Sequence, residues 1–185
     1  MSSLPPMSDR VSIPPVRIPR SALVMLSHRC AELGSDGIRA LREAGYRAGL
    51  EVLATLGGEA ERFTPQEFWH ALREALEEAS LGSVMFEPVS PAIGAVIWRG
   101  SIEAGGTRSQ SAGIRCHFAA GLLGGVLSRT AGKTVDVLEV RCGGDRSETC
   151  WFLFGTVTNI RAVYESRFRN RSDAPVGEPH PTPES

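Results

Sequence analysis

Three of the four cysteines in this 185-residue chain fall between positions 116 and 150, and a glutamate lies close to the middle one. The group consists of Cys116, Glu139, Cys142 and Cys150. Three thiolates and one carboxylate can complete a tetrahedral zinc site, and four protein ligands would close it, so the metal would be structural rather than catalytic. This spacing is less diagnostic than paired Cys-x-x-Cys motifs. The cysteines could instead be reduced thiols that are buried as small apolar side chains.

A hairpin would have to bring the last two cysteines together. Two β-strands are predicted at 134–142 and 149–157, on either side of a Gly-Gly-Asp-Arg turn at 143–146. Such a hairpin would place Cys142 beside Cys150.

A helix predicted at 114–130 would carry the remaining cysteine. Cys116 lies near its start, where the helix dipole would favour a thiolate. The carboxylate poses a geometrical problem, because Glu139 and Cys142 would point to opposite faces of a regular strand. A bend after Val140, or the reach of the glutamate side chain, would have to solve it.

The first half of the chain is predicted to form three helices, at 21–33, 36–56 and 64–79. In the second helix, Gly45 and Gly49 lie one turn apart. A glycine inside a helix costs about 1 kcal/mol relative to alanine, so this pair indicates the close approach of another backbone. The glycines between 121 and 125 are likewise interpreted as close packing rather than as a dinucleotide site.

Two further strands, at 83–89 and 92–104, are predicted before a glycine- and serine-rich loop at 105–113. Strands that occur in adjacent pairs favour an antiparallel sheet. The predicted fold class is therefore α+β, with helices packed against that sheet. The basic segment between 161 and 171 is expected to be a solvated helix end.

A single domain is expected over residues 20–170. Nine of the twelve prolines lie in the first 19 or the last 11 residues, and this composition predicts disordered ends at 1–19 and 171–185. A chain of this length can bury one sizeable core.

The net charge of −1 gives no electrostatic footprint for nucleic acid or an anionic membrane. The longest nearly apolar run, 118–127, is much shorter than the roughly 20 residues that span a bilayer. The N-terminus also lacks the basic start and apolar core of a secretory signal, so a cytoplasmic protein with reduced cysteines is expected.

The second half of the chain resembles the vinyl-reductase (4-vinyl reductase) domain family of small-molecule-binding domains. The matching residues are Cys-His-Phe-Ala-Ala-Gly at 116–121, followed by Gly125, Gly132, Glu139, Cys142 and Cys150. The pattern is most similar to the effector-sensing domains of bacterial activators that respond to phenols and alkylbenzenes. The resemblance implies structural zinc on Cys116, Glu139, Cys142 and Cys150. It also implies a homodimer and the fold shared with transport-particle (TRAPP) subunits and NO-signalling ligand-binding domains.

The same resemblance suggests where a small hydrophobic or aromatic ligand would bind. Sensors of this family hold a phenolic hydroxyl with a histidine and a tryptophan, and His70 and Trp98 are candidates by residue type. In the segment 100–104, however, Ile102 takes the place of the family's tryptophan, so that polar contact would be missing. The expected apolar lining is Ile102, Phe118, Leu122 and Val137. His70 could instead be an ordinary exposed helix residue, and the others could be plain core.

The sequence thus predicts a stand-alone, zinc-containing sensor or carrier domain that signals through protein contacts, with a possible regulatory protein partner. Two alternatives remain open at this point. One is a tetrapyrrole 4-vinyl reductase or an accessory protein of (bacterio)chlorophyll synthesis, although no acid, base or cofactor motif is recognised for that reaction. The other is a dimeric adaptor that binds no small ligand.

Overall fold

The computed structural model of the chain describes residues 19–57, 63–104, 116–143 and 149–172. Nearly all of both expected disordered ends, the 105–113 loop and most of the 143–146 turn lie outside these residues.

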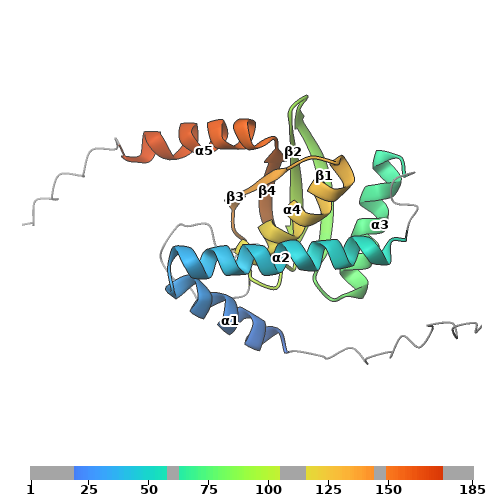
Figure 1. Cartoon of the computed structure of the whole chain (residues 1–185), viewed down its shortest axis with the longest axis horizontal. Helices are drawn as coiled ribbons and strands as arrows, with labels where there is room; N and C mark the ends of the chain where they lie inside the picture. The colour runs from blue at the N-terminus through green and yellow to red at the C-terminus, as the bar shows by residue number, and fades with distance from the viewer. Residues whose placement is uncertain (1–18, 58–62, 105–115, 144–148, 173–185) are drawn as a thin grey trace, which may run out of the picture.

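Five helices and four strands make up the described part of the chain, as Figure 1 shows. In chain order they are α1 (Arg20–Glu32), α2 (Ser35–Thr55), α3 (Pro65–Glu78), β1 (Ser83–Ser90), β2 (Ile93–Arg99), α4 (His117–Ala131), β3 (Asp136–Arg141), β4 (Thr149–Gly155) and α5 (Val157–Ser172). Each predicted helix of the first half begins and ends close to its observed bounds. The predicted α+β class is confirmed.

The four strands form one antiparallel sheet in the order β1-β2-β4-β3. β1 and β2 form one hairpin, β3 and β4 form the other, and β2 pairs with β4 where the hairpins meet. Alternate residues of the two central strands enter the core, so that Trp98 lies directly opposite Cys150 and Val96 opposite Phe152. Cys150 is therefore presented on the core face of the sheet.

Helix α4 lies against the core face of the sheet, and α2 crosses over α4 (Figure 1). The two helices touch backbone to backbone through glycines. A Cβ atom added at Gly45 would lie 2.1 Å from the carbonyl oxygen of Phe118, and one added at Gly49 would lie 2.2 Å from that of Leu122. The close approach predicted for Gly45 and Gly49 is confirmed, with α4 as the partner.

Helix α3 begins at a capping box. The Thr64 hydroxyl accepts a hydrogen bond from the Glu67 backbone, and the Glu67 carboxylate accepts one from the Thr64 backbone at 2.8 Å. The apolar side of α3 buries Phe68, Leu72 and Leu76 in the core. The opposite side remains exposed beside β1, and it borders a groove described below.

Helix α5 follows β4 directly and extends away from the body of the molecule (Figure 1). Ile160 in its second turn is buried. Sequence patterns gave little indication of this helix beyond a solvated helix end, because it has no extended apolar side. Within the described ranges, none of the helices combines the length and the apolar character needed to cross a membrane.

Candidate functional site

The structure brings Cys116, Glu139, Cys142 and Cys150 together in one cluster. One ligand atom from each residue lies within 4.8 Å of the other three. Cys116 Sγ is 3.8 Å from Cys142 Sγ and 3.5 Å from Cys150 Sγ. This Cys3Glu group could hold a metal ion.

Two structural units meet at the cluster. Cys116 is the N-cap residue of α4, and the other three residues belong to the β3–β4 hairpin. Cys116, Glu139 and Cys150 are buried, while Cys142 is partly exposed. The hairpin brings Cys142 beside Cys150, as the sequence predicted.

An irregularity in β3 solves the geometrical problem of the glutamate. Glu139 is opposite Phe152 and Arg141 is opposite Trp151, so β3 has one more residue than β4 over this step. The extra residue is Val140, which makes this a β-bulge. Because the bulge shifts the alternation by one residue, Glu139 and Cys142 reach the same side. Of the two solutions that the sequence left open, the structure shows an irregularity of the strand, located at Val140.

The carboxylate of Glu139 also joins the hairpin to the helix directly. Its Oε2 atom accepts a hydrogen bond of 3.0 Å from the backbone N–H of Cys116. Glu139 is 2% exposed, so this charge-assisted hydrogen bond lies in a region of low dielectric. This hydrogen bond fixes the start of α4 together with Cys116, whose thiol belongs to the cluster.

The crowded sulfurs favour protonated thiols where no cation is bound. Hydrogen bonds to Cys142 and then to Cys150, together with burial, raise the pKa of Cys116 far above its ordinary range. The hydrogen bond with Cys116 lowers the pKa of Cys150, but its contact with Cys142 and its burial outweigh that effect and raise the pKa to about 12. A metal ion in this position would displace those protons, since the thiolate is the form that binds metal.

The α4 N-terminus has a second carboxylate partner, Glu103, which sequence analysis missed. Its two carboxylate oxygens accept hydrogen bonds from the backbone N–H groups of Phe118 at 3.1 Å and Ala119 at 2.8 Å. Burial raises its pKa to about 7 against the opposing effect of these hydrogen bonds. A capping residue is normally sought within a few positions of a helix start, and Glu103 lies too far before α4 to be found in that way.

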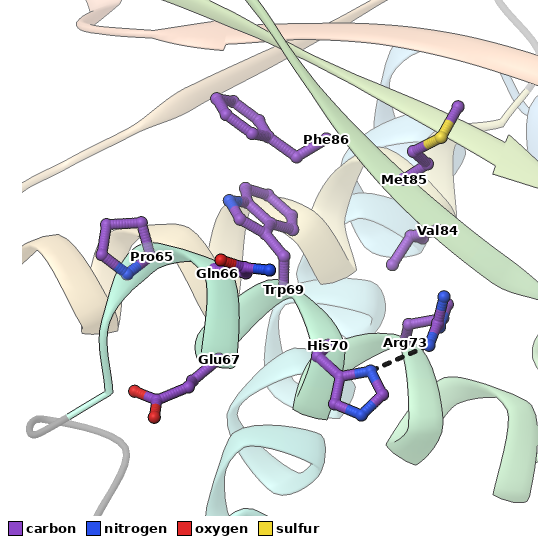
Figure 2. A pocket seen from close by; sticks show the side chains of 9 residues that line it. All are labelled: Pro65, Gln66, Glu67, Trp69, His70, Arg73, Val84, Met85 and Phe86. Atoms are coloured by element: carbon purple, nitrogen blue, oxygen red, sulfur yellow. Dashed lines mark hydrogen bonds between the residues drawn. The ribbon is translucent and has the colours of Figure 1, made fainter.

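An open groove runs between the exposed side of α3 and strand β1 (Figure 2). Its volume is about 760 Å³, and it is lined by Pro65, Gln66, Glu67, Trp69, His70, Arg73, Val84, Met85 and Phe86. The rings of Trp69 and Phe86 are stacked, with centroids 5.0 Å apart and planes 5° apart. Together they form an aromatic wall at one side of the groove.

His70, a predicted ligand residue, lies in this groove. Figure 2 shows its ring beside Arg73, whose Nη2 atom is 2.8 Å from the Nδ1 atom of His70. On its other side, Nε2 is 3.3 Å from Glu74 Oε1. Both ring nitrogens therefore already have partners on the same helix.

The other predicted ligand residues are distributed over the interior. Trp98 is 2% exposed and donates its indole N–H to the carbonyl oxygen of Leu81 at 3.0 Å. Leu122 is fully buried in the core, Phe118 packs against that core, and Ile102 is buried after β2. Val137 lines a second cavity, beside β3. Neither the groove nor that second cavity brings the six predicted ligand residues together.

Three solved structures have a similar arrangement of helices and strands. The phenol-responsive sensory domain of the transcription activator PoxR, solved with phenol, matches with a TM-score of 0.64 and 15% identity, covering 86% of this chain and 84% of that one. A trafficking protein particle complex subunit 3 from Naegleria fowleri, covalently bound to palmitic acid, matches with a TM-score of 0.53 and 11% identity, over 74% and 89% of the two chains. A vinyl-4-reductase family protein from Methanocaldococcus jannaschii matches with a TM-score of 0.47 and 16% identity, over 76% and 83%.

By sequence, no family model matches the chain, and no curated protein does. At identities this low, structural similarity shows a shared fold and no shared activity. The predicted relation to the fold of the sensory domain and the trafficking subunit is confirmed at the level of the fold.

Proposed function

We propose that this protein is a sensor or carrier domain that binds one structural zinc ion and a small hydrophobic or aromatic molecule. The observation that carries the proposal is the convergence of four ligand atoms, from a helix start and a hairpin, within 4.8 Å. The fold shared with a phenol-responsive sensory domain supports the sensing role.

The donor set and its spacing favour zinc. Zinc accepts thiolate and carboxylate ligands in tetrahedral sites, and Zn–S bonds of about 2.3 Å would separate two sulfurs by about 3.8 Å. The observed separations of 3.8 Å and 3.5 Å fit such a site. All four ligands would come from the protein, so the site would be closed and structural. Bound zinc would neutralise the thiolates and join α4 to the β3–β4 hairpin.

The groove between α3 and β1 supports binding of a small aromatic molecule. Its volume is within the usual range of ligand sites, and the stacked Trp69 and Phe86 rings offer a flat apolar wall. A phenolic hydroxyl could reach the His70 ring or the Arg73 guanidinium, which line the same groove, replacing part of their mutual hydrogen bond. We therefore place the ligand in the groove and not in the core, where Trp98 and Leu122 are tightly packed.

The contacts between these elements suggest how ligand binding in the groove would affect a partner protein. The groove is built on α3 and β1, and α3 packs on α2, which contacts α4 through the glycines. A ligand that favours one packing of α3 would shift the population of α2 and α4 arrangements. We propose that a homodimer in the reducing cytoplasm reads out this shift, with or without a further regulatory protein.

Melting of the full chain with and without a strong chelator tests the zinc site. Apparent zinc-binding free energies of about 10–16 kcal/mol are as large as the stability of a domain, about 5–15 kcal/mol. Chelation is therefore expected to unfold at least the C-terminal half. Cys142→Ser should melt early even without chelator, whereas Cys30→Ser, a matched change of the cysteine outside the cluster, should behave like the natural protein.

If the chelator and Cys142→Ser both leave the melting curve unchanged, the four residues are ordinary core packing and the zinc proposal fails.

A further inference from the structure

A second cavity lies between α2, β3 and the first turns of α5. Its volume is about 390 Å³, within the range of small-molecule sites. It is lined by Ile38, Arg42, His117, Asp136, Val137, Leu138, Val157, Ile160, Arg161 and Tyr164. None of these residues lines the groove of Figure 2, so the two cavities are separate.

The floor of this cavity is aliphatic. Val137 and Leu138 of β3 are 3% and 5% exposed, and Ile160 of α5 is 2% exposed. Ile38 and Val157 add apolar surface from the two flanking helices. An apolar body of a few carbon atoms would be well accommodated on this surface.

Two arginines line the cavity, Arg42 from α2 and Arg161 from α5. Arg42 Nη2 donates a hydrogen bond of 2.8 Å to the carbonyl oxygen of Val137, and its Nη1 is 4.0 Å from Asp136 Oδ1. Arg161 Nε donates a hydrogen bond of 3.1 Å to Glu165 Oε1. A guanidinium has five N–H donors, so both arginines keep donors for a further acceptor.

The residues that line the cavity carry two guanidinium groups and one carboxylate, Asp136, while Glu165, the partner of Arg161, lies outside the lining. The Asp136 carboxylate is already engaged, since its Oδ1 atom accepts a hydrogen bond of 2.8 Å from the Val137 backbone N–H. A carboxylate is the anion that arginine recognises with paired, charge-assisted hydrogen bonds.

A buried imidazole adds an independent indication of a polar ligand. His117 is 8% exposed, and its Nδ1 atom has no hydrogen-bond partner among the residues that the structure describes. A buried polar atom without a partner costs free energy, and a polar atom of a ligand in this cavity could supply one.

We propose that this cavity binds a small free organic acid. Its carboxylate would lie between Arg42 and Arg161, and its apolar body would lie on Val137, Leu138 and Ile160. Such a ligand would connect α5 to α2 beside the start of α4. It would thus restrain the helix that otherwise extends from the molecule.

Titration of the isotope-labelled full chain with hexanoate, followed by NMR, tests this site. Backbone amide signals of Ile38, Val157 and Ile160 are expected to shift in a saturable way. Hexanamide has the same shape without the charge, and it should bind at least about tenfold more weakly because charge-assisted hydrogen bonds are lost.

Two exposed arginines provide a matched pair of variants. Arg161→Gln removes a guanidinium from this cavity, and the binding of hexanoate is expected to weaken about tenfold. Arg47→Gln removes an equally exposed, ion-paired guanidinium that lines neither cavity, and it should leave hexanoate binding unaltered. The proposal would be overturned if the acid and the amide bind equally, or if the shifts are confined to the groove residues. It would also be overturned if the two variants have equal effects, or if no signal shifts at a large excess of hexanoate.

Discussion

The side chains around the start of α4 have distinct tasks. Cys116 offers a sulfur to the cluster, and Glu139 holds the backbone of that same residue. Glu103 accepts hydrogen bonds from the backbone N–H groups of Phe118 and Ala119. The ligand thiol is therefore fixed by two buried carboxylates from different segments, which keeps the sulfurs close before any metal binds.

The raised pKa of Glu103 makes stability depend on pH. Its folded-state pKa of about 7 is above the ordinary value of 4.5, so between these two values the folded chain keeps a proton that the unfolded chain releases. The contribution of Glu103 to the free energy of unfolding is therefore fully present below pH 4.5, and it is lost as the pH rises through about 7.

Glu103→Gln removes that titration. Chemical unfolding of both proteins from about pH 5 to about pH 8 should show the natural protein losing more stability over this range than the variant, since only the natural protein has the buried carboxyl group of Glu103 to ionise. Parallel pH dependences for the two proteins would mean that Glu103 ionises in the fold as it does in the unfolded chain.

The aromatic wall of the groove can be tested at a single residue. Trp69→Leu should weaken the binding of 4-methylphenol about three- to tenfold, because ring contacts are worth about 0.5–1.5 kcal/mol beyond the buried area. Tyr164→Leu changes an aromatic residue of the other cavity and serves as the control. Isothermal titration of both variants makes the comparison, and identical affinities would exclude the groove as the phenol site.

At the scale of the elements, α2 and α4 are in direct backbone contact. Gly121 and Gly125 of α4 lie on backbone carbonyl groups of α2, where an added Cβ would be 2.1 Å from the Arg42 oxygen and 2.2 Å from the Tyr46 oxygen. Gly124, one residue away, has room for a methyl group, since its added Cβ would make only ordinary contacts, the nearest at 3.9 Å.

Two neighbouring glycines therefore give opposite predictions. Gly125→Ala should lower the free energy of unfolding by about 1–3 kcal/mol through overpacking, despite the better helix propensity of alanine. Gly124→Ala should be neutral or should raise it by up to about 1 kcal/mol. Denaturant titrations can measure both, and a Gly125→Ala variant as stable as Gly124→Ala would show that the helices can separate without cost.

Local patterns predicted most of these elements correctly, for physical reasons. The capping box at Thr64, the glycine at 132 after α4 and the apolar stripe of α2 are all contained within a few residues. The four residues of the cluster could be predicted because a hairpin determines where its cysteines lie. Helix α5 was harder to predict, since it has no extended apolar side.

Other features depend on contacts between distant residues and could not be read from local patterns. Glu103 reaches the α4 N-terminus from 15 residues away in sequence. The two cavities arise from how α3 and α5 rest on the sheet edges, which depends on tertiary packing. The predicted ligand residues Trp98 and Leu122 were chosen by residue type, and the same apolar character suits them to the core.

For the whole molecule, the Cys3Glu cluster connects the start of α4 to the hairpin that completes the sheet. Helix α2 of the first half packs on α4. Loss of a metal bound at this cluster would therefore affect both the hairpin and the surface that α2 presents. In the proposed function, the metal would stabilise the framework and the small molecule would change its conformation.

Native mass spectrometry of the purified full chain, followed by the same sample under denaturing conditions, tests directly whether the cluster holds zinc. One zinc ion per chain is expected in the native spectrum, and it should be lost, with any small organic adduct, on denaturation. A native spectrum of the folded chain without bound metal would contradict this expectation, because the four converging residues would then be packing alone.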